Sequence, residues 1–155
     1  MGRQIFFGII LKWDYVRCTC ELSMPGYIEA IFKHFQHPHP IKPELALHQY
    51  TSRSFSATNA QAPIPYDNTA RLDASGVLRV QLVVVCILYY ARAIDSPLLP
   101  ALIEIGSDQE KATEETLDAM KKLLDFVATF PNAVIQYFAS NMCLWIVSDT
   151  SFTYI

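Results

Sequence analysis

The chain has 155 residues, 52% of them apolar, and a formal net charge of −3. A chain of this size can bury one sizeable core, and it has no low-complexity tract of the kind that indicates disorder. The acidic balance excludes a global positive field, so any contact with nucleic acid must come from local lysines and arginines.

Two strands are expected first, paired as a hairpin. Gln4–Trp13 is rich in Ile and Phe, and Arg17–Met24 alternates apolar with polar residues, as strands with one buried face do. Gly8 lies inside the first strand, where it marks either a β-bulge or a close approach of another backbone. Pro25 and Gly26 end the hairpin.

A short helix and a long loop are expected next. Tyr27–Phe35 places its apolar residues at helical spacing, and Pro38 and Pro40 stop this helix. Residues 37–69 hold five prolines among Ser, Thr, Asn and Gln, a composition that predicts an extended loop. Such a loop is unusual inside a compact domain, so it serves either as a linker or as a segment that lies on a partner.

The histidines and cysteines raise the question of a metal site. His37 and His39 could supply two ligands, but their spacing to Cys18 and Cys20 matches no standard zinc pattern. A solvated proline-rich turn explains the histidines better, and burial explains Cys18, Cys20 and Cys86 better. The N-terminus shows no signal-peptide pattern, so an intracellular protein with reduced cysteines is expected, in the cytoplasm or the nucleus.

The stretch Val77–Asp95 predicts a central helix around which the rest of the chain is arranged. Its apolar run Leu82–Ala91 covers every face of a helix, which indicates burial on most sides. The run has about half of the roughly 20 apolar residues that a membrane-spanning helix needs. No membrane contact is therefore expected.

Two further helices follow. Pro97 and Pro100 fit the first turn of a helix that Gly106 closes. Thr113–Phe130 has acidic residues at its N-terminal end and one apolar face, which predicts an amphipathic helix, and Pro131 ends it. The helices that contain Tyr27, Leu82 and Thr113 are expected to pack as a bundle with Leu88, Leu117 and Leu124 inside and Lys122 on the outer face.

The last segment predicts a second hairpin. Val134–Phe138 and Met142–Val147 have strand composition, and Ser140 and Asn141 lie between them as a tight turn. The second strand delivers Asp149 at its end.

Five strings stand out along the chain: FFGIILKWDY at 6–15, LSMPGYI at 22–28, LYYARAID at 88–95, TEETLDAMKKLLDFVATFP at 113–131 and SDTSF at 148–152. In order and spacing, and over nearly the whole chain, they resemble the reverse transcriptases of copia-type retrotransposons. There LYYARAID is similar to the region that follows the polymerase active site.

The resemblance implies an α+β chain in three parts. Residues 1–25 would form a primer-grip-like β-hairpin, and residues 26–131 a thumb- and connection-like helical bundle that includes the Pro-rich loop 37–69. Residues 132–155 would start an RNase H-like domain, with the C-terminal β-hairpin beginning its sheet.

The resemblance also implies functional residues. Phe7 and Gly8 match the primer grip, and Asp149 matches the first metal-binding carboxylate of RNase H. The thumb of the intact enzyme grips a template–primer duplex of RNA and DNA through positioned cations and polar groups. The candidates for this contact are Lys12, Arg92, Lys121 and Lys122.

The catalytic centres of the family are missing from this sequence. A reverse transcriptase holds two magnesium ions with paired aspartates in a Tyr-x-Asp-Asp motif, and no such pair occurs here. Asp149 alone cannot build a two-metal RNase H site, so it is predicted to be non-functional by itself. Magnesium is thus implied only for the intact family enzyme, and no small-molecule substrate is expected.

The leading hypothesis is a fragment of a retrotransposon pol polyprotein that handles nucleic acid without chemistry of its own. The alternative is a small helical scaffold that binds a partner protein through the Pro-rich loop, Ile41–Pro65. A metalloenzyme built on the His and Cys residues is a third hypothesis. Taken singly, the site residues also fit structural roles: Phe7 in a core, Asp149 in a turn, Lys121 and Lys122 on a solvated face.

Overall fold

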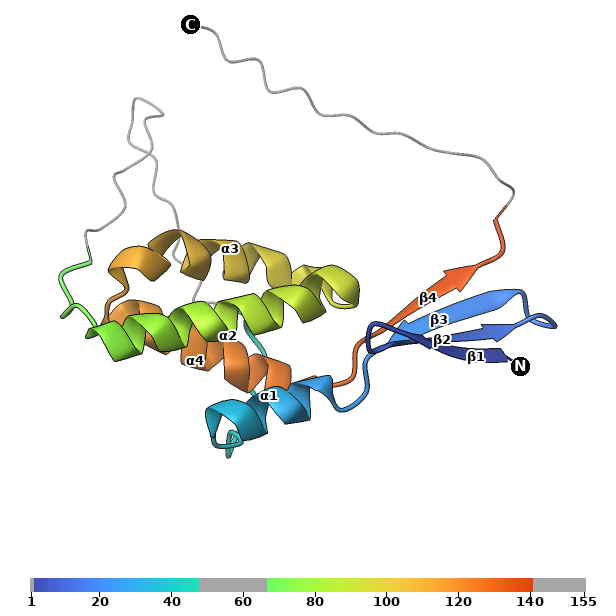
Figure 1. Cartoon of the computed structure of the whole chain (residues 1–155), viewed down its shortest axis with the longest axis horizontal. Helices are drawn as coiled ribbons and strands as arrows, with labels where there is room; N and C mark the ends of the chain where they lie inside the picture. Colours follow the sequence, from blue (N-terminus) through green and yellow to red (C-terminus); the bar gives the residue numbers. More distant parts are fainter. Residues whose placement is uncertain (1, 48–66, 141–155) are drawn as a thin grey trace, which may run out of the picture.

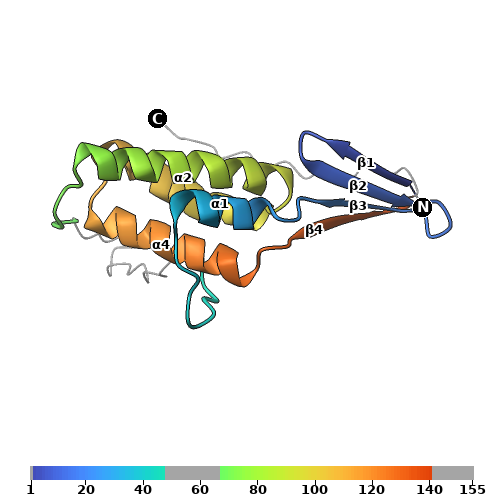
Figure 2. The same cartoon turned by 60° about the horizontal axis from the view of Figure 1, so that its bottom comes forward.

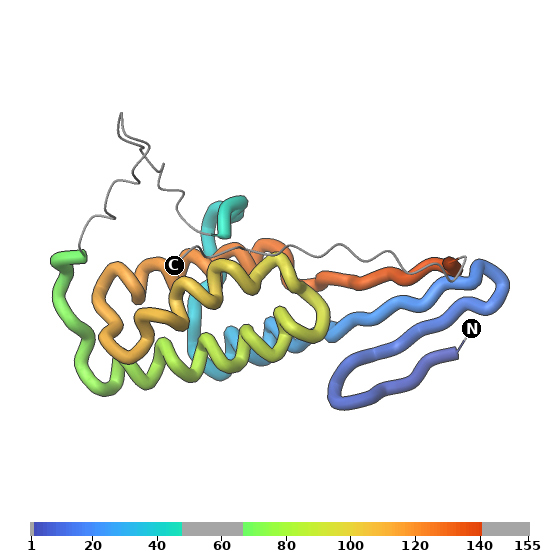
Figure 3. The backbone as a smooth tube through the Cα atoms, turned by 90° about the horizontal axis from the view of Figure 1, so that it is seen from above, coloured from blue at the N-terminus to red at the C-terminus, as the bar shows by residue number. Residues whose placement is uncertain are grey.

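In a computed structural model, residues 2–47 and 67–140 are described, and they have the predicted α+β architecture. Four helices form a body at one end of the molecule, and a four-stranded antiparallel sheet extends from it at the other end (Figure 1). The tube in Figure 3 shows that the sheet lies beyond the ends of the helices rather than across their faces.

The N-terminal region forms three strands where two were predicted. They are β1 (Gly2–Phe6), β2 (Ile9–Asp14) and β3 (Thr19–Ser23). The prediction of one unbroken strand over Gln4–Trp13 is wrong, because Phe7 and Gly8 form a two-residue turn between β1 and β2. Their φ angles are 48° and 81°, and positive φ at both central residues is typical of a type I′ hairpin turn. Gly8 therefore serves neither a bulge nor a close approach.

The fourth strand comes from the other end of the chain. β4 (Val134–Phe138) has the predicted bounds and pairs antiparallel with β3, so the sheet order is β1-β2-β3-β4. One sheet thus unites the N-terminal hairpin with the C-terminal strand, a pairing that the sequence did not predict. The predicted partner strand Met142–Val147 lies outside the described residues.

α1 (Tyr27–Phe35) has the predicted bounds, and α2 (Ala74–Ala93) is longer than its apolar run. With 20 residues, α2 is the one helix in the described ranges that is long and apolar enough to cross a membrane. Burial of α2 on most sides, however, is a wrong prediction. One face packs in the core, through Val80, Val83, Val84, Ile87, Tyr90 and Ala91, while Leu78, Leu82, Val85 and Tyr89 are exposed.

α3 (Leu99–Asp108) follows a 3-10 turn at Ser96–Leu98, and Pro100 lies in its first turn as predicted. Gly106 does not close this helix, because α3 continues to Asp108 and passes into a second 3-10 turn at Gln109–Lys111.

A capping box precedes α4 (Glu114–Thr129). The Thr113 side chain accepts a hydrogen bond from the Thr116 amide, and the Thr116 hydroxyl accepts one from the Thr113 amide. The carboxylate of Asp67 accepts hydrogen bonds from the Thr113 hydroxyl and from the amide and hydroxyl of Thr69. These bonds lower the pKa of Asp67 to about 2, because they stabilise its charged form.

The four helices enclose one hydrophobic core, which confirms the predicted bundle. Leu124 is fully buried as expected, whereas Leu88 and Leu117 are only partly buried and pack at the edge of the core. Lys122 was predicted on the outer face, but it is half-buried. Its neighbour Lys121 is exposed instead.

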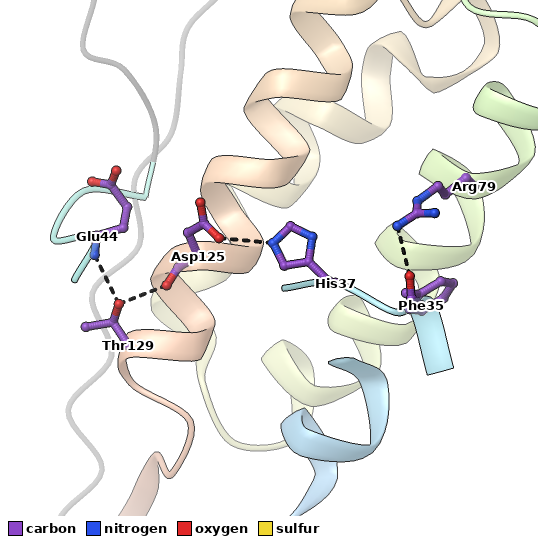
Figure 4. A network of polar contacts seen from close by, with 6 residues as sticks. All are labelled: Phe35, His37, Glu44, Arg79, Asp125 and Thr129. Atoms are coloured by element: carbon purple, nitrogen blue, oxygen red, sulfur yellow. Dashed lines mark hydrogen bonds and ion pairs between the residues drawn. The ribbon is translucent and has the colours of Figure 1, made fainter. Parts of the chain in front are cut away.

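In the first part of the Pro-rich segment, His37 and Glu44 contact α4, while most of the residues around them are exposed. The side chain of His37 is only 9% exposed, and its Nε2 lies 3.0 Å from Oδ1 of Asp125 (Figure 4). The Glu44 amide donates to the hydroxyl of Thr129, which in turn donates to the Asp125 carbonyl. The prediction of a solvated turn is therefore wrong for His37, because an acid on α4 pairs with the imidazole, whereas His39 is exposed as predicted.

Candidate nucleic-acid interface

The turn between β1 and β2 meets the C-terminal half of α2. The hydroxyl of Tyr89 donates a hydrogen bond of 2.7 Å to the carbonyl of Phe7, 82 positions earlier in the chain. Figure 2 shows this turn beside the end of α2. The contact joins two of the strings that carry the family resemblance, FFGIILKWDY and LYYARAID.

Phe7 presents an aromatic ring to solvent at this turn. Its side chain is 78% exposed, and its only aromatic neighbour in the described part of the chain is Phe6, with ring centroids 4.6 Å apart. Phe7 lies in the turn, beyond the last pair of β1 and β2 (Phe6 and Ile9), so its side chain is outside the paired part of the sheet. Phe7 is thus not a core residue, which was the structural role considered for it as an alternative to the primer grip.

Tyr90 makes the second contact between the helical body and the sheet. It is fully buried, and its hydroxyl accepts a hydrogen bond of 3.0 Å from the Ala133 amide, just before β4. Its ring stacks on Tyr27 with centroids 5.8 Å apart and planes 6° from parallel. Burial raises the pKa of Tyr90 above its ordinary value, so its hydroxyl stays protonated. The adjacent tyrosines therefore bond to opposite sides of the sheet. Tyr89 bonds to the β1–β2 turn, and Tyr90 bonds to the residue just before β4.

Of the four predicted cations, Arg92 lies near the contact between Tyr89 and the β1–β2 turn, and Lys12 lies on the sheet. Arg92 is exposed in the last turn of α2, three residues after Tyr89 and so on the same side of the helix. Lys12 is exposed on β2. Its cross-strand neighbours are Arg3 on β1 and Glu21 on β3, so a carboxylate partly offsets its charge.

The other two predicted cations lie elsewhere. Lys121 and Lys122 are midway along α4, and the Lys121 ammonium is 2.8 Å from Oδ1 of Asp118. Within residues 2–47 and 67–140, no hydrogen bond or ion pair joins these lysines to the β1–β2 turn. The structure thus brings Phe7 and Gly8 together with the Tyr89–Arg92 end of α2, and leaves the α4 lysines apart.

Arg3 is a candidate that the sequence analysis missed. It lines a shallow pocket of about 270 Å³ with Lys12, Ser23 and Asn132, which places two cations on one face of the sheet. The strand register explains the juxtaposition, because Arg3 and Lys12 are cross-strand partners in the β1–β2 hairpin. Placing the turn at Phe7-Gly8 would have revealed this pair from the sequence.

The described ranges hold no group of three or more His, Cys, Asp or Glu side chains arranged to bind a metal ion. His37 is engaged with Asp125. Cys18, Cys20 and Cys86 are free thiols. Burial was predicted for all three, but Cys18 is exposed, and Cys20 and Cys86 are only partly buried. Asp149 and the end of the predicted second strand lie outside the described residues.

Comparison with protein-family models, with curated proteins and with solved structures finds no match to this chain.

Proposed function

We propose that this chain is a nucleic-acid-handling piece of a copia-type retrotransposon pol polyprotein, with a primer-grip-like turn and a thumb-like helical body but no catalytic centre. The observation that carries the proposal is the hydrogen bond from Tyr89 to the carbonyl of Phe7. It fixes an exposed aromatic turn against the helix that carries LYYARAID. The resemblance implies a primer-grip role for the turn and places LYYARAID in the region that follows the polymerase active site.

The chemistry of the junction suits a nucleic-acid strand. An exposed ring such as Phe7 can stack on a base or pack on a sugar, an interaction that tolerates any sequence. A nearby guanidinium such as Arg92 can contact a phosphate, which positions a strand without reading its bases. The bond to Tyr89 holds the turn in place before binding, so less ordering is needed when the strand arrives.

The proposal is tested by fluorescence anisotropy with a labelled RNA–DNA primer–template duplex. We expect weak, salt-sensitive binding because few cations are present. Phe7→Ala should weaken binding about tenfold, a typical cost for losing one stacked aromatic. Arg92→Gln should reduce the slope of log affinity against log salt concentration by about one.

The β2–β3 turn offers matched controls. Tyr15 is 76% exposed, nearly the same as Phe7, and Arg17 is also exposed in that turn. Tyr15→Ala and Arg17→Gln should leave duplex affinity unchanged. Equal losses for the two aromatic variants, or no duplex binding by the wild-type chain, would contradict the proposal.

The absence of polymerase chemistry has its own test. Since the sequence has no paired aspartates of the Tyr-x-Asp-Asp type, bound duplex should not be extended when nucleotides and magnesium or manganese are added. Nucleotide incorporation above that of a heat-inactivated sample would overturn this part of the proposal. Asp149→Asn should likewise leave magnesium binding unchanged.

The scaffold hypothesis, in which Ile41–Pro65 binds a partner protein, is the second candidate. In the described part of that segment the Glu44 amide bonds to Thr129 and Leu47 packs against the helical core, whereas Ile41 and Leu45 are 101% and 73% exposed. The chain's own body therefore covers only part of this stretch.

A further inference from the structure

A shallow pocket on one face of the sheet brings two cations next to apolar side chains. Its volume of about 270 Å³ is close to the lower end of the range for ligand pockets, about 300–1,000 Å³. The strand residues that line it share one face of the sheet, because they alternate along each strand and pair across the ladder: Arg3, Ile10, Lys12, Ser23 and Val134. Pro25, Asn132 and Ala133 complete the pocket from the links that join the sheet to α1 and α4.

The two cations of the pocket are available to an external anion. Arg3 and Lys12 are cross-strand partners and both are exposed. In the part of the chain that the structure describes, neither side chain forms a hydrogen bond or an ion pair. Glu21 lies across from Lys12 on β3, whereas Arg3 on the edge strand β1 has no second strand beside it. Asp14 is two residues from Lys12, but its carboxylate accepts hydrogen bonds from two amides of the β2–β3 turn. Arg3 therefore carries an uncompensated charge that is complementary to an anion.

The rest of the pocket suits a flat body with a polar edge. Ile10 is only 8% exposed, and Val134 lies on the same face two strands away, so the two form an apolar floor. Ser23 lies between them and is half-buried. Its hydroxyl and the side-chain amide of Asn132 can each donate and accept a hydrogen bond. A ligand that matches all of these groups has an anionic end and a ring with a polar edge.

We propose that this pocket binds a nucleoside monophosphate. The guanidinium of Arg3 presents a planar fork of donors that matches two phosphate oxygens, and the ammonium of Lys12 adds a second charge. The base lies on the apolar floor, with the amide of Asn132 at its polar edge. The nucleotide is either free or the 5′-terminal nucleotide of a strand, since both carry the same phosphate and base.

The pocket uses neither Phe7 nor Arg92, so the proposal goes beyond the duplex contact and does not depend on it. Phe7→Ala and Arg92→Gln, which weaken duplex binding, should leave the affinity for a mononucleotide unchanged. The two proposals can therefore fail separately.

Amide NMR titration of the full chain with adenosine 5′-monophosphate (AMP) tests the proposal. We expect a Kd on the order of 1 mM, because the pocket is shallow, and the largest shifts at Arg3, Lys12 and Asn132. Adenosine lacks the phosphate, and inorganic phosphate lacks the base. Each should bind at least about fivefold more weakly than AMP, since each fills only one part of the pocket.

Charge variants test the assignment of the phosphate. Arg3→Gln should raise the Kd for AMP about tenfold, because it removes charge-assisted hydrogen bonds. The matched control is Arg17→Gln, the same change at an exposed residue outside the pocket, and its Kd should equal that of the wild type. Glu21→Gln should lower the Kd about two- to threefold, because the carboxylate across from Lys12 repels the phosphate. The amide spectrum of each variant shows whether it is folded.

A 5′-phosphorylated trinucleotide distinguishes the two sources of the ligand. Tighter binding than AMP that depends on Arg3 would assign the pocket to the end of a strand, and equal or weaker binding would assign it to a free nucleotide. The absence of a saturable shift up to about 10 mM AMP, ten times the expected Kd, would overturn the proposal. So would equal weakening by Arg3→Gln and Arg17→Gln, or adenosine that binds as tightly as AMP.

Discussion

The helical body and the sheet are stabilised in different ways. Among the residues that the structure describes, all of the buried apolar ones except Ile10 and Met24 lie in the body. Several large apolar residues of the sheet are exposed: Ile5, Phe6, Val134, Tyr137 and Phe138. The body therefore gains stability from apolar burial. The sheet depends on its backbone pairing and on the joins at Tyr89 and Tyr90. Because the aromatic residues of the sheet are not buried in a core, they are available to contact a ligand.

The largest effect should follow from opening the core of the body. Leu124→Ala removes a fully buried side chain and should lower the free energy of unfolding by about 2 to 5 kcal/mol. Denaturant melts would measure it. Ile103→Ala, an exposed position on α3, should cost less than about 0.5 kcal/mol. A similar small loss for both would mean that the body is not tightly packed.

A smaller effect should follow from removing the hydrogen bond between Tyr90 and the residue just before β4. Tyr90→Phe keeps the ring in the core but leaves the Ala133 amide without its acceptor, so it should cost about 1–2 kcal/mol. Hydrogen exchange should speed up in β4 more than in α4. Tyr89→Phe, which removes an exposed hydrogen bond, should cost less than about 1 kcal/mol, and its exchange effect should fall on β1 and β2. Identical exchange patterns in Tyr90→Phe and Tyr89→Phe would contradict the assignment of one hydrogen bond to each edge of the sheet.

A still smaller change, of opposite sign, is expected at the β1–β2 turn. Phe7 has φ of 48°, a conformation that a bulky side chain adopts only under strain. Asn-Gly is the favoured pair for such a turn, so Phe7→Asn should raise the free energy of unfolding by about 0.5–1 kcal/mol while it weakens duplex binding. Thermal melts and anisotropy would measure the two effects together. A destabilised Phe7→Asn variant would show that the ring supports the fold.

The smallest effect should be the pH dependence of the cap on α4. The folded-state pKa of Asp67 is about 2, below its ordinary value of 3.8. Its stabilising contribution is therefore complete above about pH 4 and is lost as the pH falls through 2. Denaturant melts of wild type and Asp67→Asn should differ by a constant amount well above pH 4, and the difference should shrink as the pH falls from 4 through 2. A difference that stays the same between pH 4 and pH 2 would exclude the carboxylate charge as its cause.

Sequence patterns predicted the helical body well because its elements have local signals. Thr113 caps α4, Pro131 follows it, and the apolar spacing of Tyr27–Phe35 gives α1 its bounds. Composition failed on α2, because a run that is apolar on every face does not show which face is covered. The exposed side is visible only once α1, α3 and α4 are packed.

The candidate site was less predictable. Phe7 and Gly8 were singled out through the resemblance, but the turn was missed because Phe is an unusual residue at positive φ. The contact with Tyr89 and the pairing of Arg3 with Lys12 depend on that turn. His37 was assigned to solvent because its partner Asp125 lies 88 positions away, a distance over which local sequence carries no signal.

The pairing of β3 with β4 also has a consequence for how the chain folds. Thr19–Ser23 must find Val134–Phe138 over a hundred positions later, and closing so long a loop has a large entropic cost. The contacts among α2, α3 and α4 and those of the two tight hairpins are closer in sequence, so they can form first. During synthesis β3 keeps an unpaired edge until β4 has left the ribosome. At that edge the nascent chain is exposed to mispairing with another molecule.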